Sequence, residues 1–272
     1  MEISEKQKAQ IEIEDKKISN NMHKIKHRIV VFSGKGGVGK TTVSVNLAYG
    51  LNTIGKETGI LDADVTGPNV PKMLGLNSRP NISDDRIYPQ EHLGVKVISL
   101  ANLVPPDQPV IWRGPMRSKL LHQFLGDVEW GELDYLVADL PPGTGDEILT
   151  MTQKMEPDLA IIVTTPQELS LIDSCKAVNM AKKMEIPNIC IIENMSGFIC
   201  PKCGYKIDLF GQGGGARQAQ KMGVFFIGAL PINIETRELA DDGKPIIVEK
   251  PNTNISIAFT DIIGRIQTIF SD

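Results

Sequence analysis

The feature that most constrains this chain is a glycine-rich run that directly follows a short apolar segment. Residues 29–33 (IVVFS) are mostly β-branched or aromatic, and they lead into GKGGVGKTT at residues 34–42. This run fits the pattern G-x-x-x-x-G-K-[ST], whose glycines let consecutive backbone N–H groups turn toward phosphate oxygens. A helix that begins after such a loop adds the partial positive charge of its N-terminus. The chain is therefore expected to contain a strand–loop–helix unit that binds the phosphates of a nucleotide.

Each residue of the run has an expected part in binding. Lys40 is expected to reach the β- and γ-phosphates, and the Thr41 hydroxyl is expected to ligate Mg²⁺. The remaining residues that we expect to contact the nucleotide are Gly34, Lys35, Gly36, Gly37, Val38, Gly39 and Thr42. The alternative is a chance match in a glycine-rich turn, which the flanking strand and helix patterns disfavour.

Lys35 requires a separate interpretation. Gly36 and Gly37 carry the backbone away from it, so its side chain cannot easily fold back onto the phosphates of its own loop. It could instead reach a phosphate bound by a facing subunit, as an arginine finger supplied in trans does. The alternative is an ordinary solvated lysine.

An alternation of apolar runs and helical stretches predicts the fold. Most runs are apolar at consecutive positions, which indicates strands buried on both faces, as in a parallel sheet. The runs lie at residues 29–33, 58–61, 95–100, 135–140, 159–164, 189–193 and 225–230. Helices are expected at about residues 40–54, 115–125, 144–155, 167–184 and 212–222. This pattern predicts an α/β fold with a doubly wound, mostly parallel sheet flanked by helices.

The domain organisation is expected to be simple. Residues 1–27 mix acidic and basic side chains and predict a charged tail or surface helix. No linker divides residues 28–272, so we expect one domain there. The last stretch, 253–271, has apolar residues at helical spacing. It could be a membrane-surface helix, but such helices are rich in Lys and Arg on the polar face, so core packing is favoured.

The composition excludes several classes of protein. The chain has 41% hydrophobic and 23% charged residues and a formal net charge of −4, which is typical of globular proteins. Its apolar runs fall far short of the roughly 20 residues that span a bilayer, and its N-terminus lacks an apolar signal segment. Mild acidity gives no general attraction to nucleic acid or anionic lipid. We expect a cytoplasmic protein with reduced cysteines and with no nucleic-acid or membrane partner.

Acidic residues follow two of the predicted strands. Asp62 and Asp64 come at the end of 58–61, on the edge where parallel sheets bind ligands, and either could orient an attacking water or support Mg²⁺. Asp139 ends an apolar run and is expected to hold Mg²⁺, while Gly143 is expected to donate its N–H to the γ-phosphate. The alternative for the aspartates is a turn or helix-capping role.

Recognition of the base is less strongly marked. Asn194 follows the strand at 189–193, and its amide offers a donor and an acceptor to a purine edge. Residues 232–235 are expected to form the opposite wall. The alternative for Asn194 is a turn residue at a strand end.

The pair Cys200 and Cys203, spaced as C-x-x-C, supplies two thiolates to one metal or cluster. Tetrahedral Zn²⁺ or a four-iron cluster needs four ligands, and Cys175 and Cys190 are expected to be small core residues. A redox dithiol and a structural half-knuckle are possible interpretations. The third is a homodimer in which each subunit contributes one C-x-x-C and a cluster bridges the two.

These motifs resemble the deviant Walker A family, K-G-G-x-G-K-[ST], which includes the MinD/ParA, nitrogenase iron-protein and Mrp/ApbC-type ATPases. The resemblance covers nearly all of residues 28–250 and is specific to the Mrp/ApbC-type iron–sulfur cluster carriers. The stretches specific to the carriers are WRGPM at 112–116, TTPQELS at 164–170, ENMS at 193–196, the cysteine pair, and residues 231–239. The resemblance implies a nucleotide-sandwich homodimer with Lys35 acting across the interface, Asp64 positioning water and Asn194 contacting adenine.

Two features of some carriers are missing. The N-terminal four-cysteine cluster of the eukaryotic cytosolic carriers and the small N-terminal domain of many bacterial members do not occur in this sequence. Functions that depend on them therefore cannot be assumed from the resemblance.

The leading hypothesis is an ATP-dependent carrier that binds a [4Fe-4S] cluster at a homodimer interface and transfers it to apo-proteins. ATP hydrolysis with Mg²⁺ is expected to be slow, and Zn²⁺ is a possible substitute for the cluster. The alternative is a MinD/ParA-like positioning ATPase that acts on membrane or DNA, which leaves the cysteine pair unexplained. An electron donor like the nitrogenase iron-protein ranks last, because it would use well-separated single cysteines.

Overall fold

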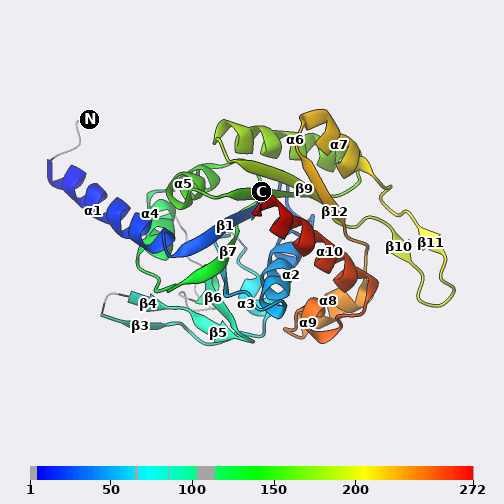
Figure 1. Ribbon diagram of the computed structural model, residues 1–272, viewed down its shortest axis with the longest axis horizontal. Helices are drawn as coiled ribbons and strands as arrows, with labels where there is room; N and C mark the ends of the chain where they lie inside the picture. Colours follow the sequence, from blue (N-terminus) through cyan, green and yellow to red (C-terminus); the bar gives the residue numbers. More distant parts are fainter. Residues whose placement is uncertain (1–4, 65–66, 85, 103–113, 272) are drawn as a thin grey trace.

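A twisted, mostly parallel sheet forms the centre of the molecule (Figure 1). The computed structural model describes residues 5–64, 67–84, 86–102 and 114–271. Eight described strands pair in the order β12-β9-β8-β1-β7-β2-β6-β5, and only β5 runs antiparallel to its neighbour. The strands are β1 (Ile25–Phe32), β2 (Thr58–Asp62), β5 (Gln90–His92), β6 (Val95–Ser99), β7 (Leu133–Asp139), β8 (Leu159–Thr164), β9 (Asn188–Glu193) and β12 (Phe225–Ala229). The predicted fold class is confirmed.

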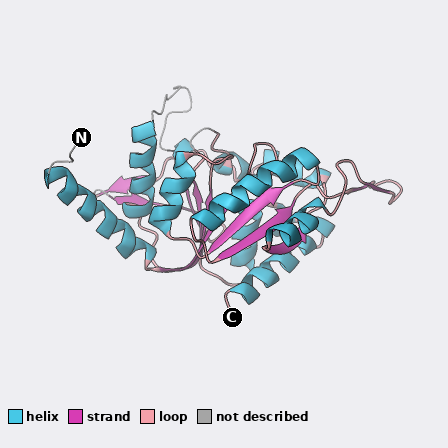
Figure 2. Cartoon of the chain, turned by 90° about the horizontal axis from the view of Figure 1, so that it is seen from above, coloured by secondary structure: helices cyan, strands magenta, loops and turns pink. Residues whose placement is uncertain are grey.

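Helices cover both faces of this sheet (Figure 2). One face packs against α1 (Glu5–Met22), α4 (Gly114–Gly126), α5 (Asp146–Met155), α6 (Glu168–Lys183) and α7 (Gly214–Met222). The other packs against α2 (Lys40–Thr53), α3 (Val70–Met73), α8 (Ile234–Asp241), α9 (Ile246–Glu249) and α10 (Asn254–Ile269). Successive residues of β1 alternate between the two cores, with Val30 in one and Val31 in the other. This two-sided burial explains why the strands are apolar at consecutive positions.

The C-terminal helix α10 packs in the core, as predicted. Its apolar side, represented by Phe259, Ile262 and Ile266, is almost completely buried against the sheet and α2. Among the described residues, no helix has both the length and the apolar character needed to cross a membrane.

The N-terminal segment joins the fold earlier than the sequence indicated. Strand β1 begins at Ile25, before the predicted start at residue 29, and Ile25 pairs with Leu133. The preceding helix α1 contributes Ile18 and Met22 to the core. Asn21 of α1 donates to the carbonyls of Leu125 and Val128, both at 2.7 Å. These contacts fix α1 against α4.

Short hairpins and helices complete the structure. One hairpin pairs β3 (Asn81–Ser83) with β4 (Arg86–Tyr88), and another pairs β10 (Phe198–Ile199) with β11 (Lys206–Ile207). A single 3₁₀ turn, η1, spans Leu100–Asn102. In Figure 1 the β10–β11 hairpin extends away from the body of the molecule. In the motif at 112–116, Trp112 and Arg113 lie outside the described residues, and Gly114 begins α4.

Candidate nucleotide and cysteine site

The glycine-rich run forms a loop between β1 and α2, as its pattern requires. Gly37 and Gly39 have φ angles of 79° and 82°, in the left-handed region that favours glycine. Gly39 also caps the N-terminus of α2. The Ser33 hydroxyl donates to the carbonyl of Lys35 at 2.8 Å, which closes the start of the loop. A Cβ on Gly34 would lie 2.2 Å from the carbonyl oxygen of Asp173 in α6. The loop and this helix are therefore so close that residue 34 has no room for a side chain.

The structure brings four of the predicted site residues together beneath this loop. Lys40 Nζ lies 2.7 Å from Asp139 Oδ2 and 3.7 Å from Asp64 Oδ2. The Thr41 hydroxyl donates to Asp139 Oδ2 at 2.7 Å, and the Ser44 hydroxyl donates to Asp139 Oδ1 at 2.6 Å. Ser44 was not predicted, although it stands one helical turn after Lys40 and therefore faces the same side. The cluster therefore connects three elements: the start of α2, the loop after β2, which carries Asp64, and the end of β7, which carries Asp139.

The donors of this cluster suit a nucleotide phosphate and a hard cation. Lys40 Nζ is buried, and within the described part of the chain no atom accepts an aligned hydrogen bond from it. An ammonium that forms ion pairs but no aligned hydrogen bond, at the start of the helix after a glycine-rich loop, is a donor that suits the oxygens of a phosphate. Thr41 and Asp139 offer a hydroxyl and a carboxylate in contact, and oxygen ligands of this kind are those that Mg²⁺ prefers. The residues present therefore fit ATP with Mg²⁺.

Asp62 is buried completely behind the cluster. Its carboxylate accepts hydrogen bonds from the Ser99 hydroxyl at 2.8 Å, from the Val70 amide at 3.2 Å and from the Asp64 amide at 3.3 Å. Burial, together with the nearby charge of Asp139, raises the pKa of Asp62 to about 7. Asp62 therefore orders the segment that carries Asp64 and does not itself line the cleft.

The cleft over the loop has a volume of about 370 Å³. Besides the loop and Asp64, it is lined by Asn69 and Lys72 near α3 and by Ala240 and Asp241 at the end of α8. The Lys72 ammonium donates to the Asp241 carbonyl at 3.3 Å across the cleft. Residues 232–235, which we expect to form a wall for the base, are not among the described residues that line this cleft, so that expectation remains a prediction. Sequence reasoning missed Asn69 and Lys72, because only the fold places them opposite the loop.

Two predicted nucleotide contacts have other partners in this structure. The N–H of Gly143, expected to face the γ-phosphate, donates to the carbonyl of Ser33 at 2.8 Å. Asn194 lies behind the loop, where its Nδ2 donates to the carbonyl of Val38 at 2.8 Å. A Cβ on Gly39 would lie 2.2 Å from Asn194 Nδ2, so the loop and this amide are in close contact. In this conformation both groups support the loop from within.

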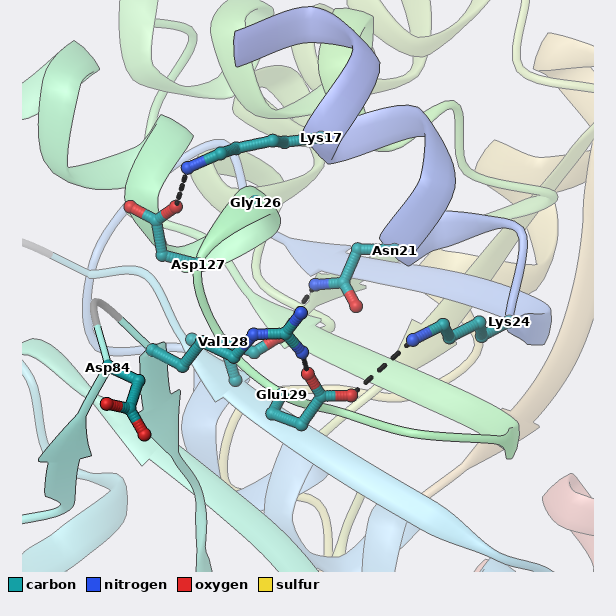
Figure 3. A pocket seen from close by; sticks show the side chains of 9 residues that line it. Lys17, Asn21, Lys24, Asp84, Gly126, Asp127, Val128 and Glu129 are labelled. Carbon is teal, nitrogen blue, oxygen red and sulfur yellow. Dashed lines mark hydrogen bonds and ion pairs between the residues drawn. The ribbon is translucent and has the colours of Figure 1, made fainter. Parts of the chain in front are cut away.

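A second recess lies away from the phosphate loop, next to α1 (Figure 3). Its volume is about 380 Å³. Lys17 pairs with Asp127 and Lys24 with Glu129, each at 3.4 Å, and Arg86 also pairs with Glu129. Because its cations are matched by acids, it offers no net charge to an anionic ligand. None of the predicted site residues lies there.

Cys200 and Cys203 lie at the end of the β10–β11 hairpin. The Cys200 amide donates to the Tyr205 carbonyl and the Gly204 amide donates to the Cys200 carbonyl, both at 2.9 Å. Backbone N–H groups of Cys203 and Lys202 and the neighbouring thiol of Cys203 lower the pKa of Cys200. Cys203 is exposed and Cys200 half-buried, and neither forms a disulfide. The turn therefore presents two thiols at the surface, one of them favoured as thiolate.

The other two cysteines lie in β9 and α6, away from the hairpin turn. Cys190 is fully buried in β9, and burial raises the pKa of its thiol to about 12. Cys175 is only half-buried and accepts a hydrogen bond from Gln218 of α7, so the expectation of a core residue is wrong for it. Among the described residues, no group of three or more His, Cys, Asp or Glu side chains could hold a metal. Within the described residues, the hairpin of one chain thus offers two thiols.

A buried acid at the base of the hairpin was not predicted. Glu193, the last residue of β9, has no exposed surface. Its Oε1 accepts from the Ser196 hydroxyl at 2.6 Å and from the Gly213 amide at 2.9 Å, while Oε2 accepts from the Gly215 amide at 2.6 Å. The glycine-rich run GQGGG at 211–215 was the available signal, because successive glycine amides can enclose a carboxylate.

The doubly wound sheet, the phosphate loop and the aspartates at neighbouring strand ends define the class of P-loop NTPases. The family model described as ParA, NUBPL iron-transfer P-loop NTPase matches residues 24–267. The chain belongs to this family, which confirms the resemblance found in the sequence.

Individual relatives agree with this assignment. The iron-sulfur cluster carrier protein of Methanocaldococcus jannaschii is 53% identical over 258 residues, covering 93% of this chain and 88% of that protein. The iron-sulfur cluster transfer protein NUBPL of Dictyostelium discoideum is 45% identical, covering 91% of this chain and 79% of that protein. A solved structure of a nucleotide-binding protein from Archaeoglobus fulgidus, in complex with ADP, has a TM-score of 0.77 and 41% identity, covering 88% of this chain and 94% of that one.

Proposed function

We propose that this protein is an ATP-dependent iron–sulfur cluster carrier that receives a cluster on its cysteine hairpin and transfers it to apo-proteins. The observation that supports this most is the pair of surface thiols, Cys200 and Cys203, on the same domain as a P-loop. Relatives that carry the name of cluster carrier align over nearly the whole chain. Thiolates are the usual ligands of iron–sulfur clusters, and free thiols fit a reducing compartment such as the cytosol.

The cluster is cargo, and one chain offers only half of its ligands. We infer that two subunits place their hairpins side by side, so that four thiolates hold one [4Fe-4S] cluster between them. Such a cluster is solvent-accessible, which suits release to another protein. Zn²⁺ could occupy the same four thiolates, because it also accepts tetrahedral sulfur coordination.

Anaerobic reconstitution tests the cargo directly. The protein should bind about four iron atoms per two chains and migrate as a dimer when loaded. A variant with Cys200→Ser and Cys203→Ser should lose the iron, whereas Cys175→Ser, which removes a thiol that is not at the hairpin, should keep it. Full iron binding by the hairpin variant would overturn the proposal.

The nucleotide site is proposed to hydrolyse ATP slowly, as expected of a carrier whose hydrolysis changes conformation. Lys40 and the loop amides hold the phosphates, and Thr41 and Asp139 are the residues that would hold Mg²⁺. When bound, Mg²⁺ neutralises charge on the phosphate oxygens. Asp64, ordered by Asp62, would orient the attacking water.

Lys35 is proposed to act on the nucleotide of the partner subunit, and this can be tested by mixing two inactive variants. In a mixed dimer of Lys35→Ala and Asp64→Asn, the site of the first chain keeps its own Asp64 and receives Lys35 from the second. Equal mixing should restore about a quarter of the wild-type rate, because half the dimers are mixed and each has one complete site. If Lys35 acted within its own chain, the mixture would stay inactive.

The competing candidate, a positioning ATPase on membrane or DNA, has less support. It needs a basic amphipathic surface helix, whereas α10 buries its apolar side in the core. It also gives the cysteine hairpin no role. We therefore propose recipient apo-proteins as partners, without a nucleic-acid or membrane partner.

A further inference from the structure

Glu193 joins both ends of the segment that carries the cysteine hairpin. Ser196 lies three residues after it, where the chain enters the hairpin, and Gly213 and Gly215 lie where the chain leaves it for α7. All three donate to the Glu193 carboxylate, at 2.6, 2.9 and 2.6 Å. One buried side chain thus fixes the entry and the exit of the hairpin relative to the end of β9.

The fit around this carboxylate is close. A Cβ on Gly215 would lie 3.0 Å from the Glu193 Cβ and 3.3 Å from its Oε2, so a side chain here would push the helix N-terminus and the carboxylate apart by a few tenths of an ångström. Gly213, whose amide donates to the carboxylate, has a φ of 71°, in the left-handed region that favours glycine. Three donors share two acceptor oxygens. A neutral amide of the same shape has a single acceptor oxygen and cannot serve all three.

The next residue links the same strand end to the phosphate loop. Asn194 Nδ2 donates to the Val38 carbonyl at 2.8 Å, and the close contact with Gly39 leaves this amide little freedom. Met195 follows with a φ of 57°, a left-handed conformation that is strained for a residue with a side chain. The turn from 193 to 196 therefore contains a strained residue. It is fixed on one side by the phosphate loop, through Asn194, and on the other by the base of the hairpin, through Glu193.

We propose that Glu193 is a positioning residue that transmits the state of the phosphate loop to the cysteine hairpin. The inference rests on the proposed function, because it concerns the cargo loop of a nucleotide-dependent carrier. When a nucleotide shifts the backbone at Val38 and Gly39, the Val38 carbonyl that accepts the Asn194 hydrogen bond moves. Because Asn194 follows it, the strained turn at Met195 moves as well. Since the Glu193 carboxylate binds both ends of the hairpin, the two thiols are displaced as a unit.

The test uses reduced protein without a cluster, so that it is independent of cargo binding. The labelling rates of Cys200 and Cys203 with N-ethylmaleimide are measured by peptide mass spectrometry, with and without ADP and Mg²⁺. In the wild-type protein the nucleotide should change these rates by about fivefold or more, the range typical of coupled sites. In Glu193→Gln the response should be lost while the affinity for ADP is unchanged.

Two matched variants complete the design. Glu132→Gln makes the same chemical change at an exposed position and should respond as the wild-type protein does. Ser196→Ala removes one of the three donors and should weaken the response; if Glu193→Gln does not fold, this variant decides.

Three results would overturn the inference: a wild-type hairpin that ignores the nucleotide, a native response in Glu193→Gln, or a native response in Ser196→Ala. None of them bears on iron binding. The inference and the carrier function can therefore fail separately.

Discussion

Asp62 stands at the last position of β2 with no exposed surface, and its ionisation is the sharpest physical prediction of this fold. The unperturbed pKa of 3.8 rises to about 7, because burial and the charge of Asp139 oppose ionisation more than Ser99, Lys40 and the Val70 amide favour it. The perturbation that probes it is Asp62→Asn, which keeps the shape and removes the titration.

The sign of the effect follows from proton linkage. Between about pH 4 and pH 7 the folded protein holds a proton on Asp62 that the unfolded chain has released. Binding more protons when folded means that stability falls as pH rises through this window. The variant lacks this titration, so its stability relative to the wild-type protein should increase over the same range.

The magnitude follows from the size of the shift. About three pKa units at about 1.4 kcal/mol each give a relative gain of at most about 4 kcal/mol between pH 4 and pH 7.5. Any hydrogen bond lost with the carboxylate shifts the free energy of unfolding of the variant by the same amount at every pH. The diagnostic quantity is therefore how the difference between the variant and the wild-type protein changes with pH, and not its absolute value.

Urea unfolding at four pH values, without nucleotide and with a chelator present, measures this slope. Asp261→Asn, at an exposed position of α10, is the matched control and should leave the wild-type slope unchanged. A flat difference between Asp62→Asn and the wild-type protein across the window would refute the reasoning, since it would mean that Asp62 is already ionised in the fold.

Two further predictions concern the phosphate loop and the thiols. Gly39→Ala should abolish nucleotide binding, measured by calorimetry, and lower the free energy of unfolding by about 1–3 kcal/mol. The reasons are that the φ of Gly39 is 82° and that a Cβ would lie 2.2 Å from Asn194 Nδ2. Nucleotide binding at the wild-type affinity would contradict this close contact. Cys200 should react with iodoacetamide near neutral pH because its pKa is lowered, whereas Cys190, buried and with a pKa of about 12, should react only after unfolding. Peptide mapping distinguishes the two, and early labelling of Cys190 would contradict its placement.

The sheet was predictable because its signal is local. Strand β8 and the second half of β1, residues 29–32, are buried on both faces, so burial alone makes them apolar at almost every position. The strands that the sequence did not predict, β3, β4, β5, β10 and β11, are short and partly exposed. Their conformation depends on turns and on neighbours distant in the chain, which no local pattern encodes.

The candidate site was predictable only as a set of residues. The motifs identify Lys40, Thr41, Asp64 and Asp139, and the parallel sheet guarantees that they meet at one edge. The hydrogen-bond partners of other site residues could not be predicted in this way. The Gly143 amide bonds to Ser33, and such choices among available acceptors depend on loop geometry that composition and spacing do not determine.

The sheet order explains how a phosphate loop and a cysteine hairpin come to share one structural element. Strand β1 leads into the phosphate loop, and β9 lies beyond β8 on the same side of the parallel sheet, so the ends of β1 and β9 lie at one edge. Consecutive residues of β9 and the turn after it then face different ways: Glu193 reaches the base of the hairpin, and Asn194 reaches the loop. A short turn is therefore enough to connect two sites more than 150 residues apart in the chain, at Val38 and Asn194. Because the hairpin itself projects from the body, movement at its base would displace both thiols without disturbing the core. A carrier needs such a movement in order to hold its cargo in one nucleotide state and to release it in another.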